Sequence, residues 1–510
     1  MVRSSGLPGS QSGLKTRLMV GMEIHVELAT RSKMFTSAAN VAHPQYFEAP
    51  PNTLLDPVVI GMPGVLPVIN REAVEMSMLV GMALGCRIAR YTKWDRKSYY
   101  YPDLPKNYQI SQYDQPLCEE GEIEIPTSDE PGAAMKTIRI IRAHLEEDAG
   151  KLLHEAPGGI PIDYSIVDLN RAGTPLLEIV TYPDFETPEE VVMFGQVLRN
   201  ICRHLGVSEG IMQKGHMRFE PNINVEIEKG GQLYYTPIVE IKNLNSFKAV
   251  YGAIIYEYER QVEAWLETGR VMGRGEKSTR GWDDVRGVTV LQREKEDAHD
   301  YRYFPDPDLV AVEVDQAWED RVRSHLGELP HVKDRRYVQD IGLSPKDSRA
   351  ILDEPAVTQF FEDVLSSGLE GKRAAAILLN YGAKRANDRG CLISDLGITA
   401  GQVKAIADLV AADKIGSSAA DKLFGLACES DQPVEELARE QGLLQVSDTG
   451  ELEHYIDQVL AEPKNAKATE DIKGGKDKAI GALMGQIMKL SKGKANPKLV
   501  TEMIKKRLQG

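Results

Sequence analysis

The sequence lacks the features of several specialised protein classes. No apolar run approaches the ~20 residues that a membrane helix needs, so we expect no membrane partner. The first stretch, MVRSSGLPGSQSGLK, has no apolar core of a signal peptide. We therefore expect residues 1–17 to be a disordered leader or a cloning remnant, and the protein to be cytoplasmic.

Cysteine is scarce and scattered. The five cysteines include no pair with C-x-x-C spacing, which argues against a structural zinc site and against a disulfide framework. The glycine-containing segment GGKDKAIG, at residues 474–481, does not fit the P-loop pattern. No ATP-binding fingerprint is therefore visible in the sequence.

Charge is unevenly distributed along the chain. The net charge is −15, yet residues 461–510 contain twelve Lys and Arg against five Asp and Glu. Two interpretations of this basic tail remain open. It is either a solvated helical segment or an appendage that binds a polyanion.

The pattern of apolar residues changes near residue 326. Before it, short alternating segments predict strands and longer periodic ones predict helices, notably residues 187–206 and 246–269. After it, helical periodicity dominates. We predict an α+β fold with three domains: a large mixed, mostly antiparallel sheet domain at 18–325, an all-α domain at 326–441 and a small α-helical tail domain at 442–510.

The segment LMVGMEIHVEL, residues 18–28, shows strict alternation typical of a half-buried strand. Its polar face carries Glu23, His25 and Glu27, which are all oxygen or imidazole ligands. Three further strand-like segments, at residues 144–151, 216–225 and 237–247, also present acidic side chains. If they are neighbours in one sheet, one face becomes a carboxylate-rich cradle that suits Mg²⁺ or Mn²⁺. A set of solvated strand faces remains the alternative.

Two segments mix basic and aromatic side chains. In residues 95–117, Arg96, Lys97 and Lys106 could hold the phosphates of ATP, and tyrosines could stack on a base. A proline-stiffened surface loop is the alternative. Residues 278–309 have the same mixture of charged and aromatic side chains, and they either line a substrate path or merely join domains.

Six motifs together resemble a known family. They are GMEIHVEL, SYYYPDLPKNYQISQYDQPL, HLEEDAGK, DLNRAGTPLLEIV, EIKNLNSF and EDAHDYRYFPDPDL. In this order they resemble the B subunits of the bacterial and organellar tRNA-dependent amidotransferase, the GatCAB complex. The resemblance runs from about residue 18 to the end of the chain.

The resemblance implies a bacterial, cytoplasmic enzyme subunit that acts on misacylated tRNA. It would use ATP and Mg²⁺ (or Mn²⁺) to phosphorylate the side-chain carboxylate of Glu-tRNA(Gln), of Asp-tRNA(Asn), or of both. Ammonia from a glutaminase A subunit would then displace the phosphate, and a small C subunit would complete the heterotrimer. Because phosphate is a better leaving group than oxide, the activation is chemically necessary.

The resemblance also implies functional residues. The expected metal ligands are Glu23, His25, Glu146, Glu147, Glu220 and Glu240, with Glu23 and Glu147 as catalytic residues. Glu27 is not among them, and we expect it to lie behind the ligands or to be solvated. The sequence departs from the family at Glu220, where family members often carry Asp, and at Asn107, where Gly is expected. The candidate tRNA-binding residues in the tail are Lys489, Lys492, Lys494, Lys498, Lys505, Lys506 and Arg507.

Two other functions stay open at this point. The chain could be a scaffold that holds tRNA while its partner supplies the chemistry. It could also be an unrelated Mg²⁺-dependent ligase.

Overall fold

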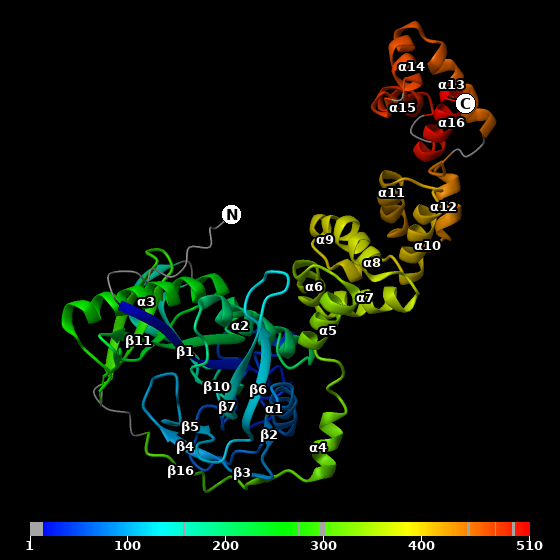
Figure 1. Ribbon diagram of the computed structural model, residues 1–510. Coiled ribbons are helices and arrows are strands. Elements are labelled where there is room, and N and C mark those ends of the chain that lie inside the picture. Colours follow the sequence, from blue (N-terminus) through cyan, green and yellow to red (C-terminus); the bar gives the residue numbers. More distant parts are fainter. Residues whose placement is uncertain are drawn as a thin grey trace. The chain divides into compact units, whose positions relative to one another are not determined.

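The architecture comes from a computed structural model, shown in Figure 1. It describes residues 14–156, 159–273, 276–295, 301–445, 449–474, 476–491 and 495–509. The chain divides into two compact units, and the division falls between Arg335 and Arg336. Among the described helices, none is both long enough and apolar enough to cross a membrane.

The first unit is built on a ten-stranded sheet. The strand order is β15-β14-β13-β11-β1-β10-β7-β6-β2, and β12 pairs with β11 away from this path. The strands are β1 (Leu14–Glu27), β2 (Arg87–Ile88), β6 (Cys118–Pro126), β7 (Met135–Glu147), β10 (Pro175–Thr181), β11 (Met217–Lys229), β12 (Gln232–Tyr235), β13 (Val239–Lys242), β14 (Lys277–Asp283) and β15 (Val288–Lys295). Of the pairings between these described strands, only β13 with β14 is parallel. The predicted mixed, mostly antiparallel sheet is confirmed.

Strand β1 lies in the middle of this sheet, between β10 and β11. Its predicted alternation is confirmed, because Leu18, Val20, Met22, Ile24 and Val26 are at most 1% exposed. Burying such side chains contributes roughly 1.5–3 kcal/mol each, and a slip of one residue would turn all of them to the polar face. The apolar face therefore fixes the register that sets the polar face.

Three helices pack against the sheet. α1 (Arg71–Ala83) contacts β6 and β7, α2 (Pro188–His204) contacts β6, and α3 (Phe247–Thr268) contacts β11 and β15. Helix α2 begins as its sequence predicts, since Thr187 Oγ1 accepts a hydrogen bond from the Glu190 N–H at 3.2 Å. Helix α3 ends at Gly269, whose φ of 67° suits glycine.

Smaller elements complete the first unit. They are β3 (Tyr91–Thr92), β4 (Asp95–Ser98), β5 (Tyr108–Ser111), β8 (Lys151–Ala156), β9 (Ile160–Asp168), β16 (Phe304–Pro305), β17 (Val312–Glu313) and α4 (Gln316–Arg323). Strand β4 pairs with both β5 and β16. The two basic-aromatic segments of the sequence therefore meet in one small sheet.

The second unit is helical and contains two separate apolar cores. Its helices are α5 (Pro330–Arg336, at the boundary), α6 (Pro345–Leu352), α7 (Pro355–Ser366), α8 (Gly371–Ile377), α9 (Ala383–Arg389), α10 (Ala400–Ala411), α11 (Ser417–Ala427), α12 (Val434–Glu440), α13 (Thr449–Ala461), α14 (Ala466–Lys473), α15 (Ile480–Leu490) and α16 (Pro497–Gln509). One core runs from Tyr337 to Ala438, and the other runs from Leu452 to Ile504. The α+β prediction with helical C-terminal parts is confirmed.

Short single turns complete the described elements. They are Pro44–Tyr46, Met212–Lys214, Tyr337–Ile341, Leu378–Gly382, Ile393–Asp395, Pro463–Asn465 and Asp477–Ala479.

Two predicted boundaries differ from the structure. β1 begins at Leu14 instead of residue 18, because Leu14 to Arg17 pair with the end of β11. The first unit extends to Arg335 instead of residue 325, because Leu326 and Leu329 pack against its core. Residues 1–13 of the expected leader lie outside the described residues.

Candidate metal centre on the polar face of the sheet

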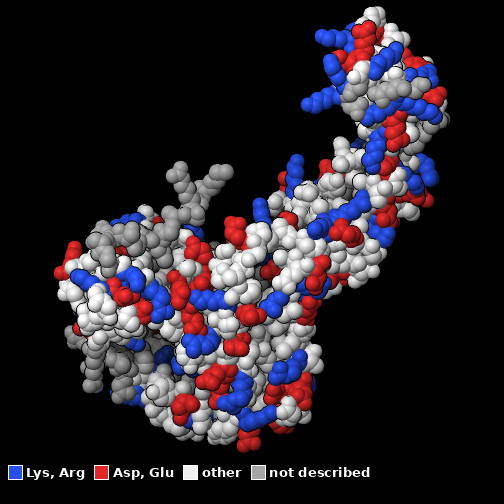
Figure 2. Space-filling view, in the orientation of Figure 1, with Lys and Arg blue, Asp and Glu red and all other residues white. Residues whose placement is uncertain are grey.

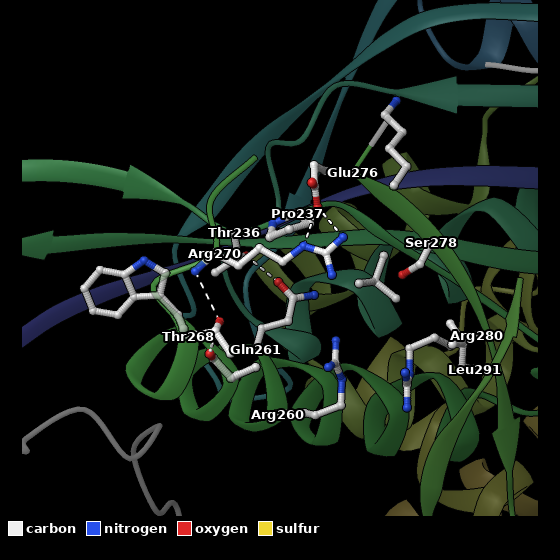
Figure 3. Close-up of a pocket in the computed structure, with 14 residues that line it drawn as sticks. Thr236, Pro237, Arg260, Gln261, Thr268, Arg270, Glu276, Ser278, Arg280 and Leu291 are labelled. Carbon is white, nitrogen blue, oxygen red and sulfur yellow. Dashed lines mark hydrogen bonds and ion pairs between the residues drawn. The ribbon is translucent and has the colours of Figure 1, made fainter. Parts of the chain in front are cut away.

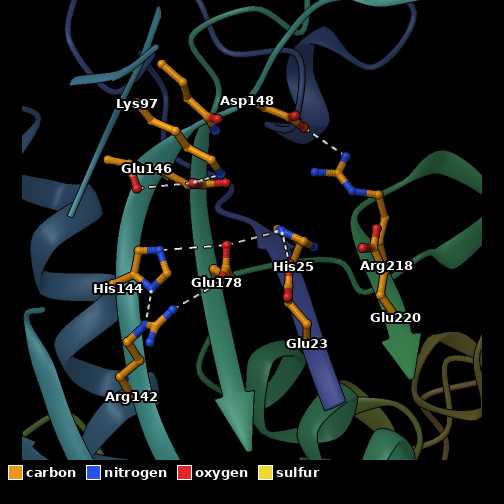
Figure 4. Close-up of polar contacts among 12 residues, drawn as sticks. Glu23, His25, Lys97, Arg142, His144, Glu146, Asp148, Glu178, Arg218 and Glu220 are labelled. Atoms are coloured by element: carbon orange, nitrogen blue, oxygen red, sulfur yellow. Dashed lines mark hydrogen bonds and ion pairs between the residues drawn. The ribbon is translucent and has the colours of Figure 1, made fainter. Parts of the chain in front are cut away.

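The register of the central strands brings ligand-type side chains together on one face. His25 on β1 lies opposite Glu178 on β10, which lies opposite His144 on β7. Glu23 on β1 lies opposite Glu220 on β11. Residues directly opposite in an antiparallel pair project to the same face, and Figure 4 shows these side chains converging.

Four of these residues, together with Glu146 on β7, form two overlapping triads. Ligand atoms of Glu23, His25 and Glu220 all lie within 4.8 Å of one another, and so do those of His25, Glu146 and Glu178. His25 Nε2 is 3.7 Å from Glu23 Oε1 and 3.5 Å from Glu178 Oε2. His25 is thus the centre of one continuous group, which we call the acidic cluster: Glu23, His25, Glu146, Glu178 and Glu220.

The carboxylates of the acidic cluster crowd one another. Burial raises the pKa of Glu23, and the nearby charge of Glu178 raises it further. Burial alone would lower the pKa of His25, but the hydrogen bond to Glu178 and the charge of Glu220 outweigh it and raise that pKa to about 9. A proton on His25 therefore relieves part of the repulsion when no other cation is present.

The donor set fits a hard divalent cation. Four carboxylates and one imidazole are the ligands of Mg²⁺ or Mn²⁺ rather than of a thiolate metal. Among the described residues, His25 Nδ1 is buried without a hydrogen-bond partner, while its Nε2 faces the carboxylates. A bound cation would replace the proton of His25. It would balance the negative charge of the carboxylates while His25 stays neutral and able to act as a ligand.

Glu178 is the residue of the acidic cluster that the sequence analysis missed. It is 6% exposed in the otherwise apolar strand PLLEIVT. His144 Nε2 lies 3.7 Å from Glu178 Oε2, and Arg142 Nε donates to His144 Nδ1 at 3.3 Å. A single buried charge in an apolar strand needs partners, and that was the signal available in the sequence.

The neighbours Glu146 and Glu147 project to opposite sides of β7. Glu146 Oε2 accepts from Ser111 Oγ at 3.2 Å and lies 3.7 Å from Lys97 Nζ. Glu147 Oε1 instead accepts from the Ile110 N–H at 3.0 Å and from Lys106. The structure thus places Glu147, expected as a ligand and catalytic residue, outside the two triads.

Glu240 also lies beside the acidic cluster rather than within either triad. Its Oε2 accepts from Thr279 Oγ1 at 2.8 Å, and its Oε1 lies 3.2 Å from Lys242 Nζ. Lys242 also reaches Glu220 Oε2 at 2.8 Å. Glu240 still raises the pKa of Glu23 through its charge, after larger contributions from burial and nearer groups.

A second group of charges adjoins the acidic cluster on the same face. Arg218 Nη1 lies 3.3 Å from Glu27 Oε1 and 2.8 Å from Asp148 Oδ2, and Arg171 Nε lies 3.5 Å from the same Asp148 oxygen. We call these four residues the arginine-paired group. Glu27 is 3% exposed, so the interpretation of it as a solvated residue is wrong.

Of the three cations expected to bind ATP, Lys97 contacts the acidic cluster, whereas Arg96 and Lys106 pair with carboxylates outside it. Lys97 Nζ is 5.3 Å from the centroid of the Tyr301 ring as well as close to Glu146. Arg96 pairs with Asp306 at 2.8 Å and Asp308 at 2.9 Å, and stacks on Tyr108. Residues of the segment from 301 onward therefore contact Arg96 and Lys97, and the two interpretations of that segment stay open.

The candidate tRNA-binding residues of the tail are only partly described. Lys492 and Lys494 lie outside the described residues. Lys498 Nζ is 3.0 Å from Asp413, and Arg507 Nη2 is 2.7 Å from Asp457. Lys489 and Lys506 are exposed and Lys505 is half-buried. Figure 2 shows Lys and Arg side chains projecting from this part of the chain.

Comparisons with known proteins agree over nearly the whole chain. Residues 18–320 match the family described as the GatB/GatE catalytic domain, and residues 359–508 match the GatB domain. The chain is similar to proteins named as the B subunit of the aspartyl/glutamyl-tRNA(Asn/Gln) amidotransferase. That of Thermomicrobium roseum is 43% identical over 494 residues, which are 96% of this chain and 98% of the relative. That of Caldicellulosiruptor saccharolyticus is 42% identical over 499 residues, 97% of this chain and 100% of the relative.

Proposed function

The chain belongs to the GatB family of tRNA-dependent amidotransferase B subunits, and we propose that its acidic cluster is the site where a misacylated aminoacyl-tRNA is activated with ATP. The substrate would be the side-chain carboxylate of Glu-tRNA(Gln), of Asp-tRNA(Asn), or of both. The observation that carries the proposal is the pair of ligand triads that share His25.

The acidic cluster would hold Mg²⁺ or Mn²⁺ through Glu23, His25, Glu146, Glu178 and Glu220. A bound cation would neutralise the charge of phosphate oxygens during phosphoryl transfer. The side chain of Glu23 is 31% exposed, so the cluster opens to a substrate rather than being sealed inside the core.

Lys97 would orient the anionic reactants. Burial favours its neutral amine, but Glu146 and Glu178 outweigh burial and hold the pKa of Lys97 above its usual range. Its ammonium therefore stays charged at the edge of the cluster, where it can position a phosphate or a carboxylate oxygen.

The proposed reaction has two steps. A carboxylate oxygen of the substrate attacks the γ-phosphorus of ATP, the bond to the leaving ADP breaks, and an acyl phosphate forms. The nitrogen of ammonia then attacks the acyl carbon, phosphate leaves with the bonding electron pair, and the nitrogen loses a proton. A partner glutaminase subunit would supply the ammonia, a small third subunit would complete the complex, and the basic tail would attract the tRNA.

The test is amidation with free ammonium and ATP in the assembled complex, so that glutamine hydrolysis does not enter. We expect Glu23→Gln to abolish amidation and Mn²⁺ binding while tRNA affinity stays unchanged. The matched control is Glu228→Gln on β11, an exposed carboxylate that pairs only with Lys15 among the described residues. Full amidation by Glu23→Gln would disprove the proposed site and favour a scaffold that only holds tRNA.

A further inference from the structure

A separate pocket lies at the C-terminal end of α3, between this helix and strands β13 and β14. Its volume is about 460 Å³, and its lining includes Arg260, Gln261, Arg270, Lys277 and Arg280. In Figure 3 the guanidinium groups of Arg260, Arg270 and Arg280 come from three different segments and surround one space. A pocket of this size can hold a small organic molecule.

This pocket and the acidic cluster lie on opposite faces of the sheet. Thr279 and Arg280 are consecutive on β14, so their side chains project to opposite faces. Thr279 donates to Glu240 beside the acidic cluster, whereas Arg280 lines the pocket. The pocket is therefore not a part of the metal centre.

Guanidinium groups outnumber carboxylates around this pocket. Glu257 is fully buried and accepts from Arg260 Nε at 3.0 Å and from Gln261 Nε2 at 3.0 Å. It also accepts from Thr289 Oγ1 at 2.9 Å, so its oxygens are already occupied. Arg280 Nε lies 3.7 Å from the same carboxylate and donates to the neutral Thr289 Oγ1 at 2.7 Å, while its Nη2 donates to the Thr289 carbonyl at 2.8 Å. One carboxylate thus serves two arginines.

The remaining charges do not remove this excess. Arg270 pairs with Glu276, and Lys277 adds another cation to the lining. Burial lowers the pKa of Arg280, and the neighbouring charge of Arg260 lowers it further. Among the described residues, four cations thus meet two carboxylates, Glu257 and Glu276, at this pocket.

We propose that this pocket binds a phosphate group. A carboxylate ligand would bring one negative charge, whereas a phosphate carries close to two and would balance the excess. Guanidinium groups also match phosphate oxygens in geometry. The phosphate could be the monoester of a small metabolite, which carries close to two charges, or a phosphodiester of an RNA backbone, which carries one charge and would balance part of the excess.

The first experiment titrates inorganic phosphate into the full chain in phosphate-free buffer and follows binding by calorimetry. We expect one saturable site in the wild type. Arg280→Gln should weaken phosphate binding by about tenfold, the equivalent of one charge-assisted hydrogen bond. Arg270→Ala should also weaken phosphate binding. It replaces Arg280→Gln as the test variant if that protein does not fold, because the Arg270 side chain is 59% exposed and its loss should not disturb the core.

Arg286→Ala is the matched control. Arg286 lies on the turn between β14 and β15, is 68% exposed and does not line the pocket. Its phosphate affinity should equal that of the wild type. The proposal is overturned if the wild type shows no saturable phosphate binding, or if Arg280→Gln and Arg270→Ala bind phosphate as tightly as Arg286→Ala.

A second measurement distinguishes the two sources of phosphate. If the pocket receives RNA, Arg280→Gln should weaken tRNA binding and reduce its salt dependence by about one phosphate contact. If it receives a small molecule, tRNA affinity should stay unchanged while phosphate binding is weakened. Mn²⁺ binding should be normal in Arg280→Gln in both cases, which separates this proposal from that of the metal centre.

Discussion

Two groups of charged side chains lie next to each other on the polar face of the central sheet. In the arginine-paired group, Asp148 contacts Arg218 and Arg171. Burial alone would raise the pKa of Asp148, but these two arginines hold it well below its usual range. Glu27 then keeps its proton more readily, because burial and the charge of Asp148 raise its pKa to about 8.

The acidic cluster has a weaker arginine contact, because Arg142 Nη2 lies 3.9 Å from Glu178 Oε1, compared with 2.8 Å from Arg218 to Asp148. Its four carboxylates surround His25, and among the described residues lysines reach Glu146 and Glu220, at its two ends. The same residue types on the same sheet thus form a closed ion-pair network in one place and an open set of ligands beside it. The difference teaches that a close guanidinium makes a buried carboxylate structural, whereas a more distant one leaves the carboxylates able to hold a cation.

The largest expected effect tests this difference with one substitution in each group. Glu178→Gln removes a charge from the acidic cluster but keeps the side-chain shape, so amidation should fall about a thousandfold and Mn²⁺ binding should be lost. Glu27→Gln changes the arginine-paired group, where the carboxyl is already largely protonated, and should leave Mn²⁺ affinity nearly unchanged. Manganese electron paramagnetic resonance measures both affinities. Equal losses in the two variants would show that the groups are not distinct.

The next effect concerns stability. Arg218→Met leaves Asp148 buried without its closest guanidinium, and it should lower the free energy of unfolding by about 3 kcal/mol. Chemical denaturation followed by circular dichroism measures this change. Adding Asp148→Asn to Arg218→Met should restore part of the loss, because the unpaired charge is then gone.

A surface arginine supplies the control for this substitution. Arg139 pairs with Asp184 at the surface, with 56% of its side chain exposed, and Arg139→Met should leave the unfolding midpoint unchanged. If Arg218→Met is as stable as Arg139→Met, then the arginine-paired group does not hold the fold together.

The sequence predicted the charged residues of β1 better than the partners that these residues contact on neighbouring strands. The alternation of β1 placed Glu23, His25 and Glu27 on one face, because period-two patterns depend only on local geometry and burial. Their separation into two groups depends on Arg218 and Glu178, which come from β11 and β10. Strand order is a long-range property, and no pattern within β1 contains it.

The expected ligands Glu147 and Glu240 illustrate the same limit. Both occur in acidic motifs, yet Glu147 projects toward β5 and accepts the N–H of Ile110, and Glu240 is held by Thr279 from the neighbouring strand. Helix ends were more predictable than these contacts. The caps of α2 and α3 use residues within three positions of the helix start, so the relevant contacts are already in the local sequence.

The smallest expected effect is a pH dependence that differs between the two groups. In the metal-free protein the pKa of His25 is raised to about 9, and its neutral form is the one that binds a cation. Each unit of pH below 9 should therefore weaken Mn²⁺ binding about tenfold, through the release of one proton. Titrations of Mn²⁺ at pH 6.5, 7.5 and 8.5 measure this slope.

The stability of the metal-free protein should fall as the pH rises, whereas Mn²⁺ affinity should increase. The folded pKa of His25 is above its ordinary value of 6.5, so its contribution to stability is complete below pH 6.5 and is lost as the pH rises through 9. His25→Gln removes the proton site, and the stability of this variant should lack that decline. Glu27→Gln should retain it, because Glu27 belongs to the arginine-paired group. A Mn²⁺ affinity that does not change between pH 6.5 and 8.5 would mean that His25 is not a ligand, and the acidic cluster would then bind the cation through carboxylates alone.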